Sequence, residues 1–166
     1  MTLYLVVPFL FAIAILQTSA VPHLTVWGVF PDVPVLVVAS WGLLRGRREG
    51  AIWGLIGGMA VDLLSGLPAG AATLSLIAVG LLSGLAQTSA FRQHGILPVI
   101  TIFLATIAYD LVTLLILGIS GSRVLWLDSL IRIVLPSAVL NGALAPMVYW
   151  TMRSLYARFG SDDMGR

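Results

Sequence analysis

Long apolar runs separated by short polar links make up nearly the whole chain, and this pattern predicts six membrane-spanning helices. The expected spans are residues 3–21, 32–44, 50–64, 71–87, 96–119 and 129–152. A transmembrane helix needs about 20 consecutive apolar residues, which most of these runs approach. The run 32–44 is shorter, so we expect either a locally thin bilayer or a crossing completed by irregular backbone of residues 26–30 packed against other helices.

Composition assigns the chain to the integral membrane proteins. Of its 166 residues, 59% are hydrophobic and 10% are charged, whereas a soluble domain is roughly half apolar and a quarter charged. The mean hydropathy is +1.04. We therefore expect one all-α transmembrane domain over residues 1–166, folded as a compact six-helix bundle. The net charge of +2 is too small to indicate a nucleic-acid partner, and the lack of cysteine excludes disulfides and thiolate metal sites.

Arginine is distributed unequally between the two sides of the predicted bundle. The links after the second and fourth spans, with the C-terminal tail, carry the expected topology anchors Arg45, Arg47, Arg48, Arg92 and Arg153. The opposite links carry Arg123, with Arg132 just inside the membrane. Because basic residues concentrate on the cytoplasmic side, this bias predicts a multi-pass protein with both termini in the cytoplasm.

Tryptophan positions support the same topology, because tryptophan favours the two membrane–water interfaces. We expect Trp27 and Trp126 at the outer interface. The inner interface is expected to hold Trp41, Trp53 and Trp150.

Glycine recurs every four residues along the third predicted span, which places the glycines on one helix face. Small residues at this spacing let two membrane helices approach closely. The predicted helix-packing face comprises Gly50, Gly54, Gly58 and Gly66, with Gly80 and Gly84 on the fourth span as its mate. The facing helix belongs either to this bundle, which we favour, or to another chain.

Four polar residues lie inside the predicted spans, where each is costly without a partner or a task. Asp62 and Arg132 enter the membrane to similar depth from the same side, which predicts a structural ion pair. Alternatively, Asp62 serves a partner or ligand from a cavity, or reaches up to water. Asp110 lies deeper, and Asn141 is its expected hydrogen-bond partner. A proton or ion pathway through Asp110 is the alternative, although pathways normally use a longer chain of such groups.

No catalytic, cofactor-binding or metal-binding set is predicted. His23 and His94 fall in links on opposite sides of the membrane, so they cannot share a site. A Ser–His–Asp arrangement cannot be assembled within one leaflet, and the histidine spacing typical of a metal site is absent. The glycine-rich segment 54–58 lacks the lysine and the strand of a phosphate loop, so we interpret it as a packing motif.

Several short motifs in residues 16–70 resemble those of the rod shape-determining protein MreD family. Each is weak alone, but their order and spacing together are specific. They are Leu16-Gln17-Thr18, Pro31-Asp32, Trp41-Gly42-Leu43-Leu44-Arg45-Gly46, Arg48-Glu49-Gly50-Ala51, Trp53-Gly54-Leu55-Ile56-Gly57-Gly58, Asp62-Leu63-Leu64-Ser65-Gly66 and Pro68-Ala69-Gly70. Beyond residue 70 the match is limited to length, span number and the six-helix layout.

The resemblance implies a non-enzymatic scaffold of the cell-elongation machinery in the bacterial inner membrane. Its expected partners are MreC, the MreB filament, the RodA glycosyltransferase and a class B penicillin-binding protein, besides membrane lipid. The family is also similar in fold to S-components of energy-coupling-factor transporters, so a vitamin-like carrier subunit is the alternative. Those subunits dock through an Ala-x-x-x-Ala pattern on the first helix, whereas here Leu16 follows Ala12 and Thr18 follows Ala14, which counts against that alternative.

Overall fold

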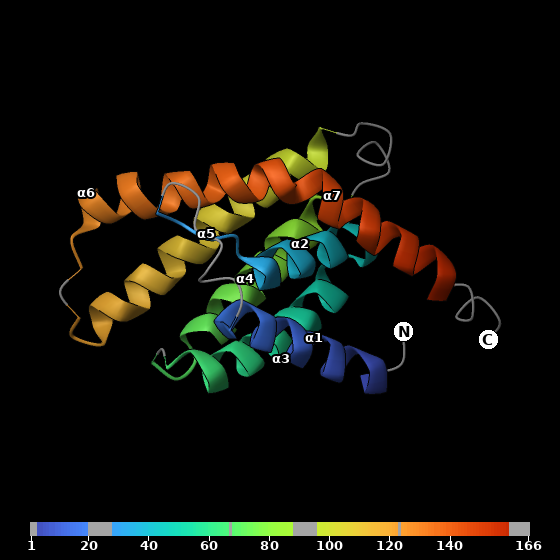
Figure 1. Cartoon of the computed structure of the whole chain (residues 1–166), viewed down its shortest axis with the longest axis horizontal. Coiled ribbons are helices and arrows are strands. Elements are labelled where there is room, and N and C mark those ends of the chain that lie inside the picture. Colours follow the sequence, from blue (N-terminus) through green and yellow to red (C-terminus); the bar gives the residue numbers. More distant parts are fainter. Residues whose placement is uncertain (1–2, 20–27, 67, 88–95, 123, 160–166) are drawn as a thin grey trace.

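The computed structural model describes residues 3–19, 28–66, 68–87, 96–122 and 124–159, and within these ranges it is a bundle of helices without a strand. The elements are α1 (Leu3–Ser19), α2 (Val33–Arg45), α3 (Arg47–Ser65), α4 (Ala71–Leu85), α5 (Leu97–Ile119), α6 (Trp126–Ser129), the π-helical turn η3 (Leu130–Val134) and α7 (Leu135–Phe159). Because α6, η3 and α7 form one continuous rod, the bundle has six long helical units (Figure 1).

Successive helical units run in opposite directions, so α1 begins and α7 ends at the same end of the bundle (Figure 1). The units α1 and α3 lie on one side, α5 and α7 on the other, and α2 and α4 between them. The helices 97–119 and 126–157 are long and apolar enough to cross a membrane, while α1, α2 and α4 are shorter apolar helices. Crossing by all six units remains a prediction.

Helix α2 is the centre of the bundle, and this position explains why it is apolar on all sides. Every residue from Pro34 to Leu44 is buried, and the helix contacts α1, α3, α4, α5 and α7. A helix that is apolar all round is stable where protein surrounds it on every side. Residues 26 and 27, which would extend this crossing, lie outside the described residues, as does the predicted end of the first span at residue 21.

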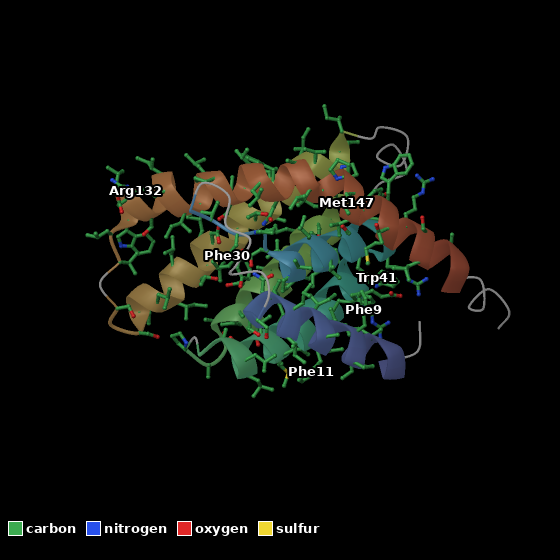
Figure 2. All side chains as sticks on the ribbon, viewed as in Figure 1. Phe9, Phe11, Phe30, Trp41, Arg132 and Met147 are labelled. Carbon is green, nitrogen blue, oxygen red and sulfur yellow. The ribbon has the colours of Figure 1, made fainter. Side chains whose placement is uncertain are left out.

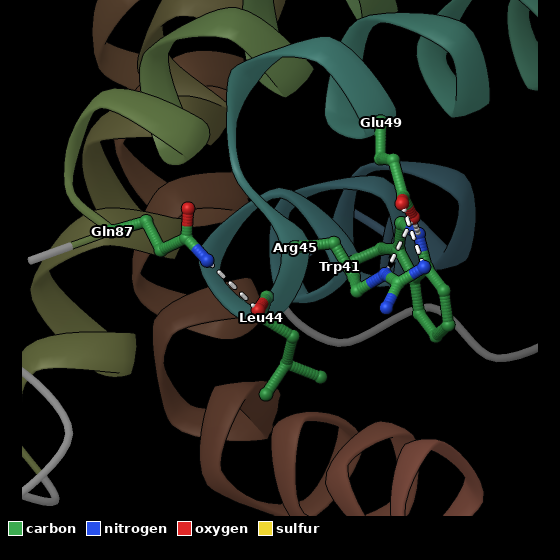
Figure 3. Close-up of polar contacts among 5 residues, drawn as sticks. All are labelled: Trp41, Leu44, Arg45, Glu49 and Gln87. Carbon is green, nitrogen blue, oxygen red and sulfur yellow. Dashed lines mark hydrogen bonds and ion pairs between the residues drawn. The ribbon is translucent and has the colours of Figure 1, made fainter. Parts of the chain in front are cut away.

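The link predicted at residues 45–49 is reduced in the structure to a single residue. Gly46, with φ of +92°, joins α2 directly to α3, which begins at Arg47 instead of at residue 50. Such a φ favours glycine, and a Cβ on Gly46 would collide with the side chain of Gln87. The Gln87 amide instead donates a 3.0 Å hydrogen bond to the carbonyl of Leu44, tying the junction to the end of α4 (Figure 3).

An ion pair and a cation–π contact hold the same junction together. Glu49 accepts hydrogen bonds from Arg45 at 2.8 Å and from the Trp41 indole at 3.1 Å (Figure 3). The bond to Glu49 raises the pKa of the Arg45 guanidinium above its ordinary value. The same guanidinium lies 5.3 Å from the centre of the Tyr156 ring, so Arg45, a predicted topology anchor, also connects α2 to the last turns of α7.

Two tryptophans predicted at the inner interface are core residues. Trp41 and Trp53 are 2% and 4% exposed, and their rings stack with centroids 4.1 Å apart. Their large apolar area is better buried between α2 and α3 than at an interface. Trp150 and Trp126 are exposed, as an interfacial belt requires, while Trp27 lies outside the described residues.

The sixth predicted span is longer than expected and contains a π-helical turn. The helical rod begins at Trp126, inside the predicted link, and continues to Phe159. Within it, the amide of Leu135 bonds to the carbonyl of Leu130, one residue further back than in an α-helix. Pro136 follows at once; its ring clashes with the carbonyl four residues earlier in a regular helix, and a wider turn at this point relieves the clash.

Cysteine labelling tests the predicted topology without background, because the native chain has no cysteine. Cysteine introduced at Ser122, in the α5–α6 link, should react with a membrane-impermeant maleimide added to intact cells. Cysteine at Ser161 should react only after permeabilisation. Labelling of Ser161 from outside, or protection of Ser122, would contradict the six-span arrangement.

Candidate functional site

Helices α3 and α4 meet along the predicted glycines. A Cβ on Gly50 would strike the Gly80 carbonyl, one on Gly54 the backbone of Leu76, and one on Gly58 the backbone of Thr73. In the reverse direction, a Cβ on Gly80 or Gly84 would strike the backbone of Gly50 or Arg47. The glycine face therefore has its mate inside the bundle, and α3–α4 is the most extensive helix contact.

The observed packing face differs from the predicted one at two glycines. Gly66 lies outside the contact: it is the C-cap of α3 with φ of +65°, and a Cβ there would meet no atom within 4 Å. Four-residue spacing placed it on the face, but the helix ends one residue earlier. Gly42 on α2 belongs to the contact instead, because its Cβ would strike Ser83 and the Gly80 carbonyl. It lies on the preceding helix, α2, so the glycine repeat along α3 did not reveal it.

Asp62 caps the N-terminus of α4, and the predicted ion pair with Arg132 is wrong. Its carboxylate accepts hydrogen bonds from the amides of Gly70, Ala72 and Thr73 at 3.1, 2.8 and 3.1 Å, and from the Thr73 hydroxyl at 2.6 Å. These amides have no partner within their own helix, and a carboxylate is favourable at a helix N-terminus. Asp62 is thus fully used in joining the end of α3 to the start of α4.

Arg132 lies on the opposite helical layer, in the turn η3. Its guanidinium forms a 2.6 Å ion pair with Asp128, one turn earlier in the same rod. The Arg132 side chain is 77% exposed, and it lies at the far end of the bundle from Trp41 (Figure 2). The similar depth expected for Asp62 and Arg132 did not bring them into contact, because the two residues lie on different sides of the bundle.

Asn141 does not bond to Asp110, so the second predicted pair is also wrong. Asn141 is fully buried; its side-chain oxygen accepts the backbone amide of Asp32 at 3.0 Å, and its amide nitrogen donates to the Thr106 hydroxyl at 3.2 Å. It therefore links α7 to α5 and to the segment before α2. Among the described residues, Oδ2 of Asp110 is buried and has no hydrogen-bond partner.

Gln17 of α1, a residue that sequence reasoning gave no structural role, organises the start of α2. Its oxygen accepts the amide of Val33 at 3.1 Å, and its nitrogen donates to the Pro31 carbonyl and to the Asp32 carboxylate, both at 3.3 Å. Asp32 occupies the N-cap position, yet its own carboxylate makes no capping hydrogen bond. The cap comes from another helix, which local sequence cannot reveal.

A cavity of about 600 Å³ opens beside this network, between the ends of α1 and α3, the segment before α2, and the middle of α5 and the rod of α7. Its polar lining includes Gln17, Thr18, Asp32, Tyr109, Asp110 and Ser137. Apolar side chains, among them Phe30, Leu64 and Ile133, complete the wall. In the view of Figure 2, Phe30 lies near α5 and the neighbouring ends of α1 and α2, and the residue is 41% exposed.

The cavity carries two carboxyl groups and no basic side chain among the described residues that line it. Groups of three histidine, cysteine or acidic side chains suited to a metal ion do not occur in the described ranges. The predicted anchors Arg47, Arg48 and Arg153 lie on α3 and α7, away from the cavity, and Arg92 falls outside the described residues.

A comparison with protein-family models matches residues 1–159 to the family described as rod shape-determining protein MreD. The match covers both the glycine face and the cavity-lining residues. Searches of the curated proteins and of the solved structures return no match.

Proposed function

The chain belongs to the MreD family of rod shape-determining membrane proteins, and we propose that it acts as a non-enzymatic scaffold and regulator of the cell-elongation complex. The family match over residues 1–159 is the observation that carries this proposal. Under this proposal, the chain binds MreC directly and thereby supports peptidoglycan synthesis. RodA, the class B penicillin-binding protein and MreB associate with it directly or through MreC.

We also propose that the protein is a multi-pass component of the bacterial inner membrane with both termini in the cytoplasm. The alternating direction of the six helical units supports this topology (Figure 1). The contact between Arg45 and Tyr156 also supports it, because this contact brings the arginine-bearing α2–α3 junction and the end of α7 to the same end of the bundle. Arginine at one end of the bundle is expected on the cytoplasmic side.

The short links leave the outer faces of the helices as the main surface for a partner that crosses the membrane. Met59 on α3 is 54% exposed and Met147 on α7 is 73% exposed, and the two helices lie on opposite sides of the bundle (Figure 1). A bitopic partner contributes a single helix, so it should cover one side and leave the other facing lipid.

Site-specific photo-cross-linking tests this proposal and locates the interface. A benzophenone amino acid placed at Met59 or at Met147 in living cells should give a cross-link to MreC from one position and not from the other, which serves as the matched control. Purification of the complex should retain MreC. Retention of an energy-coupling ATPase in place of MreC, with no MreC cross-link from either side, would overturn the scaffold in favour of a transporter subunit.

A further inference from the structure

We propose that the cavity between α1, α2, α5 and α7 binds an ammonium group carried on a compact organic body. The site is built from residues of this chain alone, so the inference does not depend on MreC binding. Its ligand is either a soluble amine or the ethanolamine headgroup of a lipid, because both present the same charged group.

The charge of the cavity is the first argument. Asp32 and Asp110 both line it, and the other titratable group in the described lining is Tyr109. The described lining residues of α1, α3, η3 and α7 are uncharged: Gln17, Thr18, Val61, Leu64, Ser65, Ile133 and Ser137. Two ionised carboxyl groups lining one mostly apolar, half-open cavity are costly unless they become neutral or a positive charge balances them, and the described wall supplies no such charge.

The unequal bonding of the two carboxyl groups is the second argument. Asp32 is held by Gln17, whose nitrogen donates to Oδ1. Asp110 is 9% exposed, lines the cavity, and has an Oδ2 atom without a partner among the described residues. Buried polar atoms are nearly always bonded, and the Asp110 carboxyl, which lines the cavity, therefore has acceptor capacity that the described part of the protein does not use.

Size and wall chemistry define the class of ligand. A volume of about 600 Å³ lies within the usual range of small-molecule sites, about 300–1,000 Å³, and exceeds what a bare metal ion fills. An ammonium group presents N–H donors to carboxylates, as the lysine side chain does. Phe30, Leu64 and Ile133 would cover the carbon atoms attached to it, and the hydroxyl groups of Tyr109 and Ser137 offer further polar contacts.

Thermal unfolding of the purified full chain in a neutral, lipid-free detergent tests the proposal. Tryptophan fluorescence monitors the unfolding. Butylammonium chloride is compared with butanol in sodium chloride of equal ionic strength. A short-chain phosphatidylethanolamine is compared with the matching phosphatidylglycerol. At about ten times its Kd, the bound amine should raise the unfolding midpoint by about 3 °C or more. A rise with both amines indicates that the ammonium group suffices, and a rise with phosphatidylethanolamine alone identifies the lipid as the source.

Variants connect the shift to the cavity. Asp110→Asn should abolish the amine-dependent rise, and Asp32→Asn should weaken it, whatever either change does to the unliganded midpoint. Asp128→Asn removes an exposed carboxylate outside this cavity and should keep the full rise. The proposal is overturned if neither amine exceeds its control in the native chain, or if Asp110→Asn retains the shift.

Discussion

Gly54→Ala should destabilise the protein, while Gly57→Ala on the same helix should be nearly neutral or stabilising. A Cβ on Gly54 would lie closer than 3.0 Å to backbone atoms of Leu76 and Ile77, and backbone cannot rotate away as a side chain can. Helices α3 and α4 would have to separate, at a cost of about 1–3 kcal/mol for overpacking. At Gly57 the nearest atoms belong to the side chains of Leu10 and Val38, at 3.7 and 3.8 Å, which is ordinary contact.

The comparison is well matched because both changes add one methyl group to α3 and both replace glycine by a better helix former, worth about 1 kcal/mol. The difference between the two variants therefore reports the α3–α4 contact alone. Unfolding midpoints in detergent, with gel filtration to detect aggregation, give the measurement. Equal midpoints for Gly54→Ala and Gly57→Ala would show that α3 and α4 do not approach as closely as the structure indicates.

The helices and the glycine face were predictable because both are properties of local sequence. Apolar runs fix where helices form in a membrane, and residues four apart share a face whatever surrounds the helix. Gly50, Gly54 and Gly58 therefore pointed to a close contact before the partner helix was known. The same logic assigned Gly66 to the face wrongly, because spacing does not reveal where a helix stops.

The polar contacts were less predictable. The sequence indicates how deep a residue lies along its helix, but it does not indicate which other helix that residue faces. Asp62 and Arg132 were expected at similar depth, but they lie on different elements, α3 and η3, on opposite sides of the bundle (Figure 1). Each finds a partner closer in sequence: the start of α4 for Asp62, and Asp128 for Arg132. Local spacing did not reveal that Asp62 caps α4, because the amides that it accepts lie 8, 10 and 11 residues further along the chain.

The cavity could not be read from the sequence at all. Its two acids come from the segment before α2 and from the middle of α5, and Gln17 reaches Asp32 from α1. The side chain that accepts the Asp32 amide, Asn141, comes from a fourth element. Only the packing of all these helices brings the groups together, so composition and spacing gave Asp110 the wrong partner.

Asp62→Ala should lower the free energy of unfolding by about 2–3 kcal/mol, because it removes the acceptor of three backbone amides and one hydroxyl at the start of α4. Asp62→Asn, which keeps one acceptor oxygen, should cost less.

Arg132→Gln should change stability by about 0–1 kcal/mol, since its ion pair with Asp128 is exposed. Without contact between Asp62 and Arg132, the double variant Asp62→Asn with Arg132→Gln should equal the sum of the single changes within about 0.5 kcal/mol. Reversible unfolding of the four proteins in mixed detergent measures this cycle. A double variant more stable than that sum by over about 0.5 kcal/mol would show that Asp62 and Arg132 are coupled and would contradict the structure.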